Sequence, residues 1–72
     1  MKIIVNGRDH EWTNPRRRIG YEFLVLIAGH YPEHRPTVTY QQPNEQGDIL
    51  LPGKFAPIED GTRFFVAHTG AA

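Results

Sequence analysis

The segment Thr62–His68 constrains the fold of this chain more than any other stretch. As a strand it would place Phe64 and Val66 on one face of a sheet. Phe65 and Ala67 would then lie on the opposite face. A strand that is apolar on both faces usually lies inside a sheet and not at its edge. We therefore expect this segment to be a central strand with which other strands pair.

The four residues that follow, 69–72 with the sequence TGAA, carry no bulky side chain. Chain ends of this kind commonly fray after the last strand of a domain. A thin, exposed tail after a central strand also suits a protein whose end is handled by other proteins. We predict a folded domain over residues 1–68 and a flexible tail over residues 69–72, and both interpretations of the tail stay open.

The first thirteen residues predict a β-hairpin. Met1–Asn6 alternates in the manner of a strand with one buried face. Asn6-Gly7 follows, and this dipeptide favours a type I′ turn because both central residues need a positive φ. Arg8–Thr13 is then the return strand, with His10 and Trp12 on a shared face.

The segment Ile19–Gly29 has the pattern of a helix. Gly29 suits the position just after a helix end, and it follows an apolar stripe at helical spacing that consists of Tyr21, Leu24, Ile27 and Ala28. Phe23, Val25 and Leu26 are apolar as well, so the helix is apolar nearly all round. We expect Phe23 and Leu26 to pack beneath the long loops. The alternative is that they form a contact surface.

The remaining segments predict a mixed sheet. Thr37–Gln41 is rich in β-branched and aromatic residues, Ile49–Leu51 is a short strand, and Lys54–Ile58 is a brief extended piece. A single helix after a hairpin must lie across one face of the sheet so that both bury their apolar sides. If the last strand pairs with the first, the two are parallel and the connection is right-handed. The order of elements therefore predicts an α+β β-grasp, a four- to five-stranded sheet packed on one helix.

Composition and charge exclude several classes of protein. A chain of 72 residues forms at most one small domain. Eight Lys and Arg balance eight Asp and Glu, and this zero net charge argues against nucleic acid as the main partner. No apolar run approaches the ~20 residues that span a membrane. The chain has no cysteine, and we expect a cytoplasmic protein without a membrane partner.

No motif in the sequence indicates catalysis. The nucleophile elbow, a reactive cysteine and a glycine-rich phosphate loop are all missing from the sequence. Four histidines, His10, His30, His34 and His68, are spread over four segments, and Pro32 interrupts the helical spacing that would align two of them. A zinc site would need a third ligand. We expect no catalytic residue, no metal and no cofactor.

Four stretches carry a family resemblance: IIVNGRDHEW (3–12), GYE (20–22), TVTY (37–40) and LPGKFAPIEDGTRFFV (51–66). Together they cover most of residues 2–66 and resemble the bacterial multi-ubiquitin domain family, ubiquitin-like proteins encoded beside enzymes similar to those of the ubiquitin pathway. The resemblance implies a ubiquitin-like β-grasp and a small protein modifier. Its carboxyl group would be adenylated by an E1-like enzyme, passed to an E2-like enzyme and attached to a target protein. Some precursors of this kind are first trimmed by a peptidase.

The tail departs from the ending that the resemblance implies, since ubiquitin-type modifiers typically end in Gly-Gly. Here a single glycine, Gly70, precedes Ala71 and Ala72. A peptidase could expose Gly70 as the reactive carboxyl, or Ala72 itself could be activated. In a third interpretation the domain is not conjugated and only binds a partner. A sulfur-carrier protein is a more distant alternative, because such carriers also end in Gly-Gly.

A partner-binding surface is predicted on the face of the sheet that points away from the helix. If Phe64 and Val66 point inward, Phe65 and Ala67 point outward. Ile4 of the first strand would join them, with His68 close by. Exposed apolar patches that include an aromatic residue favour protein binding.

Overall fold

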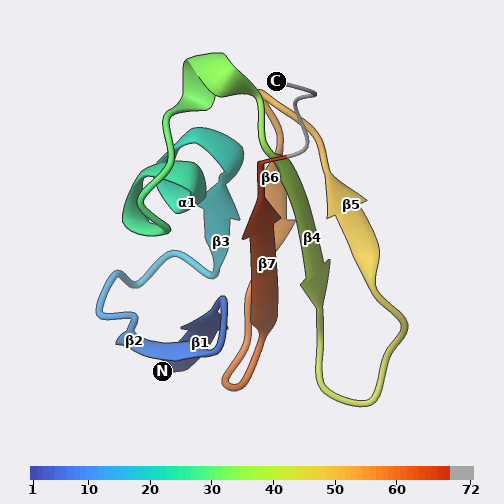
Figure 1. Ribbon diagram of the computed structural model, residues 1–72. Helices are drawn as coiled ribbons and strands as arrows, with labels where there is room; N and C mark the ends of the chain where they lie inside the picture. Colours follow the sequence, from blue (N-terminus) through green and yellow to red (C-terminus); the bar gives the residue numbers. More distant parts are fainter. Residues whose placement is uncertain (69–72) are drawn as a thin grey trace.

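The computed structural model describes residues 1–68, which form two β-sheets and one α-helix (Figure 1). The main sheet has five strands in the order β2-β1-β7-β4-β5. Their bounds are Lys2–Val5 for β1, Arg8–Glu11 for β2, Thr37–Gln41 for β4, Asp48–Leu50 for β5 and Arg63–Ala67 for β7. A second, two-stranded sheet joins β3 (Arg18–Gly20) to β6 (Phe55–Pro57). The helix α1 spans Tyr21–Ile27, and a single 3₁₀ turn, η1, spans Pro32–His34.

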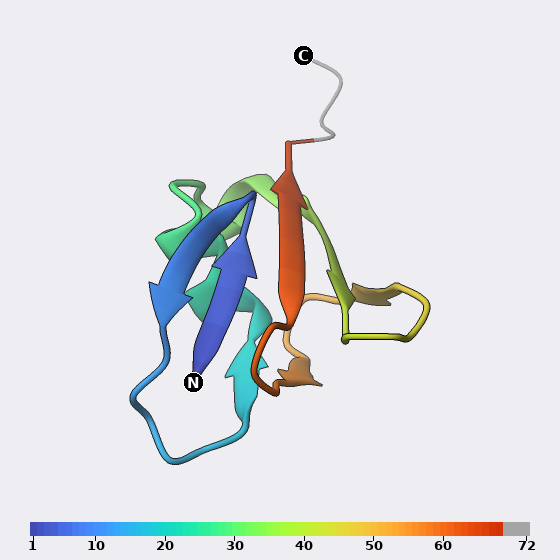
Figure 2. The ribbon, with the colours of Figure 1, turned by 90° about the horizontal axis from the view of Figure 1, so that it is seen from below.

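The last strand, β7, lies at the centre of the main sheet, as the sequence predicts. It pairs in parallel with β1, where Val5 lies opposite Phe64. On its other side it pairs antiparallel with β4, where Val38 lies opposite Val66. Figure 2 shows β7 between the β1–β2 hairpin and β4. One helix covering a mixed five-stranded sheet is an α+β, ubiquitin-like β-grasp, and the predicted fold class is confirmed.

The opening hairpin is also confirmed. β1 and β2 pair antiparallel, with Ile3 opposite His10. Asn6 and Gly7 have φ angles of 51° and 79° at the turn between them. Positive values at both central residues are what a type I′ turn requires, and Asn-Gly accepts them at little cost.

The helix is shorter than predicted, because Ile19 belongs to a strand. Ile19 pairs with Ala56 of β6, and the N–H of Tyr21 donates to the carbonyl of Lys54 at 3.0 Å. This pairing with a segment far along the chain keeps Gly20 extended, with φ −84° and ψ 150°. The C-terminal end is as predicted. The N–H groups of Gly29 and His30 donate to the carbonyls of Leu26 and Val25, which is a Schellman motif.

The expectation that Phe23 and Leu26 pack beneath the loops is wrong. Phe23 is 52% exposed and Leu26 is 55% exposed. The helix buries Tyr21, Leu24 and Val25 instead. A helix of seven residues turns only one narrow side to the sheet, and the chain has too little material to cover the other side. Within residues 1–68 no helix is long and apolar enough to cross a membrane.

The core lies between the helix, the main sheet and the β3–β6 sheet. It consists of Ile3, Val5, Ile19, Tyr21, Leu24, Val25, Val38, Leu50, Ala56, Ile58, Phe64 and Val66. The hydroxyl of Tyr21 lies within this core. The hydroxyl of Tyr21 donates a 2.5 Å hydrogen bond to the carbonyl of Pro36, which is itself buried. This bond joins the start of the helix to the residue before β4.

Burial of Tyr21 raises the pKa of its hydroxyl, the charge of Glu22 raises it further, and Arg35 lowers it. We expect Tyr21→Phe to reduce the free energy of unfolding by about 1–3 kcal/mol at neutral pH, because the Pro36 carbonyl loses its donor. Above about pH 10 the unfolded tyrosine deprotonates before the folded one, so this contribution decreases as the pH rises. The difference between the two proteins should therefore shrink in alkaline buffer.

Urea unfolding between pH 7 and pH 11 measures this difference. Tyr31→Phe is the matched control, since Tyr31 is 60% exposed. It should change stability by no more than about 0.5 kcal/mol. An equal loss in both variants would contradict a structural role for the Tyr21 hydrogen bond.

Candidate functional site

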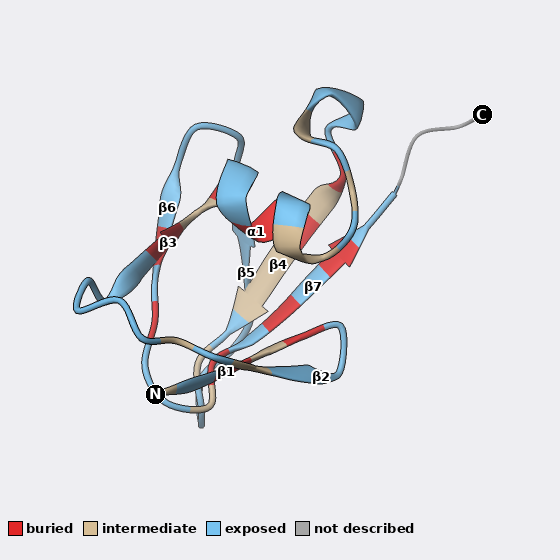
Figure 3. Cartoon of the chain, turned by 90° about the vertical axis from the view of Figure 1, so that its left-hand side faces the viewer, coloured by how far each residue is buried: buried red, intermediate tan, exposed pale blue. Residues whose placement is uncertain are grey.

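The two faces of the central strand differ sharply in exposure. Phe64 and Val66 are buried toward the helix, whereas Arg63, Phe65 and Ala67 are exposed on the other side. Figure 3 shows this alternation along β7. The strand is therefore apolar on both faces, but only one face is covered.

An apolar row crosses the uncovered face. Phe65 lies opposite Thr39 of β4, and Thr39 lies opposite Ile49 of β5. Phe65 is 52% exposed and Ile49 is 53% exposed. Thr39 lies between these two side chains, on β4, so the three residues form one row across β7, β4 and β5. We call this the outer sheet face and define it by Ile4, Thr39, Ile49, Arg63, Phe65 and Ala67.

A shallow hollow lies at one end of the outer sheet face. Its volume is about 490 Å³, and it is lined by Ile4, Gln41, Gln42, Pro43, Asn44, Gly61 and Arg63. Ile4 lies opposite Arg63 across the β1–β7 pairing. Arg63 therefore lies beside the half-buried Ile4 and two residues before Phe65 on β7, so a partner on this face would meet a cation next to apolar groups.

The structure brings some of the predicted surface residues together. Phe65 and Ala67 share the exposed side of β7, and Ile4 reaches the same face one strand away. His68 is exposed, and its ring meets the edge of the His34 ring at 5.9 Å. The predicted acyl donors, Gly70 and Ala72, lie outside the described residues, as does the whole predicted tail 69–72.

Sequence reasoning missed three residues of this face, Thr39, Arg63 and Ile49. The large apolar residue among them is Ile49. Ile49 lies in β5, a strand of only three residues, and it joins the outer sheet face by pairing with Thr39 of β4. The alternation of Ile49, Leu50 and Leu51 could have indicated an exposed apolar side chain. The register that places it in the same row as Phe65, with Thr39 between them, depends on pairings across two strands and is not visible in the sequence.

On the β1 side of β7, the end of the strand is held by the side chain of Asn6, while β4 pairs with the other side as far as Ala67. The backbone N–H of Asn6 donates to the carbonyl of Phe64 at 2.9 Å, and beyond Asn6 the main chain turns away from β7. The side chain then continues the pairing. Asn6 Nδ2 donates to the carbonyl of Val66 at 3.1 Å, and the N–H of Val66 donates to Asn6 Oδ1 at 2.8 Å. This Asn6–Val66 clasp extends the parallel ladder beyond the last paired residue of β1.

The other end of β7 is anchored by the same strand, β1. The N–H of Lys2 donates to Asp60 Oδ1 at 2.8 Å, and the N–H of Gly61 donates to the carbonyl of Lys2 at 2.7 Å. Thr62 is buried, and its hydroxyl accepts from the N–H of Glu59 at 2.9 Å. Both ends of β7 are therefore fixed, and the position at which the chain leaves the sheet is well defined.

Side chains that could serve a metal or a catalytic reaction are not gathered at this face. Within residues 1–68 no group of three His, Asp or Glu side chains is placed to hold a metal ion. His34 and His68 are neighbours through their rings, and Tyr31 packs against His34 at 5.7 Å. The outer sheet face can bind by apolar contact and by the charge of Arg63.

The chain matches the family model of the multiubiquitin domain over residues 1–70. It belongs to the multiubiquitin family. No curated protein and no solved structure matches it. The family match and the observed β-grasp both agree with the resemblance of the sequence to a small ubiquitin-like domain. The match includes Gly70 and ends before Ala71.

The Asn6–Val66 clasp generates a prediction for this multiubiquitin domain. Asn6→Gly keeps a residue that accepts the positive φ of the turn but removes both side-chain hydrogen bonds. We expect the free energy of unfolding to fall by about 1–3 kcal/mol, at 0.5–1.5 kcal/mol for each bond. Hydrogen exchange should also become faster at the Val66 amide.

Asn44→Gly provides the control, because Asn44 also has a positive φ of 64° but lies in an exposed loop. Urea unfolding and amide exchange of the two variants separate the clasp from a general effect of glycine in turns. Equal losses in both variants would contradict the clasp.

Proposed function

We propose that this domain is a ubiquitin-like protein modifier of a bacterial conjugation pathway. An E1-like enzyme would adenylate its carboxyl group, and an E2-like enzyme would pass the acyl group to a target protein. The observation that carries the proposal is the exit of β7. The central strand of the fold is fixed by Asn6 at Val66, four residues before Gly70. A rigid domain that ends at a defined point suits an enzyme that must grip the domain and reach its carboxyl.

The proposed reaction takes its reacting groups, apart from the carboxyl, from the partner enzymes and not from the domain. The modifier is the acyl donor, and the partner enzymes supply the nucleophile and the nucleotide. Residues that enter a narrow enzyme channel must be small, and glycine allows the backbone to approach the nucleophile closely. Residues 69–72, TGAA, meet this requirement. The domain needs no catalytic group, and an ATP-dependent pathway of this kind would operate in the cytoplasm.

Two residues are candidates for the reactive carboxyl. In the first version a peptidase removes Ala71 and Ala72, and Gly70, the one glycine of residues 69–72, becomes the reactive carboxyl. This version also holds if further residues follow Ala72. Activation of Ala72 itself is the second version, and it needs no peptidase.

The alternative function is a binding module that is not conjugated. The outer sheet face supports it, because Phe65 and Ile49 are both about half exposed and lie in one row with Thr39. Apolar surface of this kind is typical of protein interfaces. Such a module would use Phe65 and Ile49 and would not depend on residues 70–72.

Coexpression with the products of its neighbouring genes tests the proposal by intact mass. We expect loss of two alanine residues, or a covalent adduct on an E1-like enzyme, an E2-like enzyme or a target. Deletion of residues 70–72 should abolish every adduct while leaving noncovalent binding intact. An unchanged mass with all the neighbouring enzymes and ATP present would reject conjugation.

Phe65→Ala is the complementary variant. If the domain is only a binding module, this variant should weaken capture of the partner at least tenfold, and deletion of residues 70–72 should have no effect. If the domain is a modifier, the deletion abolishes adducts even where Phe65→Ala merely slows their formation. Thermal unfolding of both variants checks that the fold is retained.

A further inference from the structure

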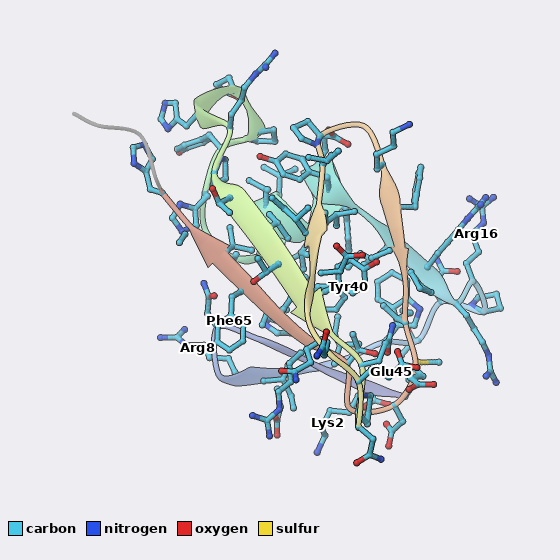
Figure 4. All side chains as sticks on the ribbon, turned by 90° about the vertical axis from the view of Figure 1, so that its right-hand side faces the viewer. Lys2, Arg8, Arg16, Tyr40, Glu45 and Phe65 are labelled. Carbon is cyan, nitrogen blue, oxygen red and sulfur yellow. The ribbon has the colours of Figure 1, made fainter. Side chains whose placement is uncertain are left out.

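A second apolar site lies away from the outer sheet face, where the β2–β3 loop, the helix and the β3–β6 sheet meet. It is a pocket of about 180 Å³. Its lining residues are Trp12, Asn14, Arg16, Arg18, Ile19, Gly20, Phe23 and Phe55. We call it the aromatic pocket. Figure 4 shows Arg16 on the opposite side of the molecule from Phe65.

The walls of the aromatic pocket are three aromatic rings from separate elements. The edge of Trp12 meets the ring of Phe23, with centroids 6.1 Å apart and planes at 74°. Phe23 is 52% exposed and Phe55 is 59% exposed. Phe55 lies against the backbone of Gly20, where an added Cβ would come within 3.1 Å of the Phe55 ring. Gly20 thus gives Phe55 its position at the rim.

Hydrogen bonds hold the loop that carries the basic residues. The indole N–H of Trp12 donates to the carbonyl of Arg16 at 2.7 Å. The N–H of Arg16 donates to the side-chain oxygen of Asn14 at 2.9 Å. These two bonds fix the loop beside the Trp12 ring. As a result, Arg16 and Arg18 border the pocket in a defined arrangement.

The lining of the aromatic pocket includes two arginines, Arg16 and Arg18. None of its lining residues is acidic, although the whole chain has no net charge. Within residues 1–68 neither Arg16 nor Arg18 forms an ion pair. The guanidinium of Arg18 instead lies 5.2 Å from the centre of the Phe55 ring. The nearby Glu22 accepts a hydrogen bond from the N–H of Gly53 at 2.9 Å.

We propose that the aromatic pocket binds an acidic segment of a partner protein. One large apolar side chain of that segment would enter between Phe23 and Phe55, and its flanking carboxylates would pair with Arg16 and Arg18. Ligand sites for small molecules have volumes of about 300–1,000 Å³, so this smaller pocket suits a single side chain. Arginine pairs well with carboxylates and stays charged while it stacks on an aromatic ring. The proposal uses neither the carboxyl of the tail nor the outer sheet face, so it does not depend on the proposed function.

The single tryptophan of the chain, Trp12, lines the pocket and reports on it directly. The probe is an eight-residue peptide with blocked ends, a central Leu-Phe pair and three acidic residues on each side. We expect saturable changes in Trp12 fluorescence and in its indole N–H resonance. A peptide with lysines in place of the acidic residues, and one with Ala-Ala in place of Leu-Phe, should each bind at least tenfold more weakly.

Two pairs of variants localise the binding. Arg18→Glu and Phe55→Ala should each weaken binding of the acidic peptide at least tenfold. Their matched controls, Arg63→Glu and Phe65→Ala, make the same changes on the outer sheet face and should bind as the unmodified domain does. Gly20→Ala keeps every side chain of the pocket but displaces Phe55, and should also weaken binding. Circular dichroism verifies that each variant is folded.

The proposal is overturned if the acidic peptide gives no saturable change, or if the basic peptide binds equally well. It is also overturned if Arg63→Glu weakens binding as much as Arg18→Glu. Single-stranded oligonucleotides are tested in parallel. If an oligonucleotide binds more tightly than the acidic peptide, the occupant of the pocket is a nucleic acid and not an acidic protein segment.

Discussion

The parallel pairing of β7 with β1 is the interaction on which the rest of the structure depends. It joins the first and last strands of the domain. Because these two strands run parallel, the chain between them forms a crossover connection that contains every other element. The pairing is secured at both ends, by Lys2 with Asp60 and Gly61 and by the Asn6–Val66 clasp. The hydrogen bonds of β1 and Asn6 on one side, and the pairing with β4 as far as Ala67 on the other, therefore define where the chain leaves the sheet.

The small size of the domain explains its two exposed apolar regions. One helix of seven residues can cover only one face of a five-stranded sheet, which leaves Phe65 and Ile49 exposed on the other. The same helix is too short to bury all of its own apolar residues, and Phe23 remains at the surface beside Trp12. The two regions lie on opposite sides of the core, so two partners could bind at the same time.

Much of the fold could be predicted from local patterns, whereas the details of the candidate site could not. The Asn6-Gly7 turn, the helix end at Gly29 and the strand Thr37–Gln41 depend on neighbouring residues and were predicted correctly. The early start assigned to the helix was wrong because Ile19 pairs with Ala56, 37 residues further along the chain. Ile49 was missed for the same reason, since its place in the row with Thr39 and Phe65 depends on pairing with β4.

The sequence by itself determined that β7 is a central strand with apolar residues on both faces and small residues after it, because alternation and side-chain size are local properties. It also determined the hairpin and the family resemblance. Only the tertiary structure decided which apolar residues stay exposed and which of them meet. Strand register places Phe65 and Ile49 in one row on either side of Thr39, and helix placement brings Phe23 against Trp12 at the pocket that Phe55 also lines. Both depend on contacts between distant parts of the chain.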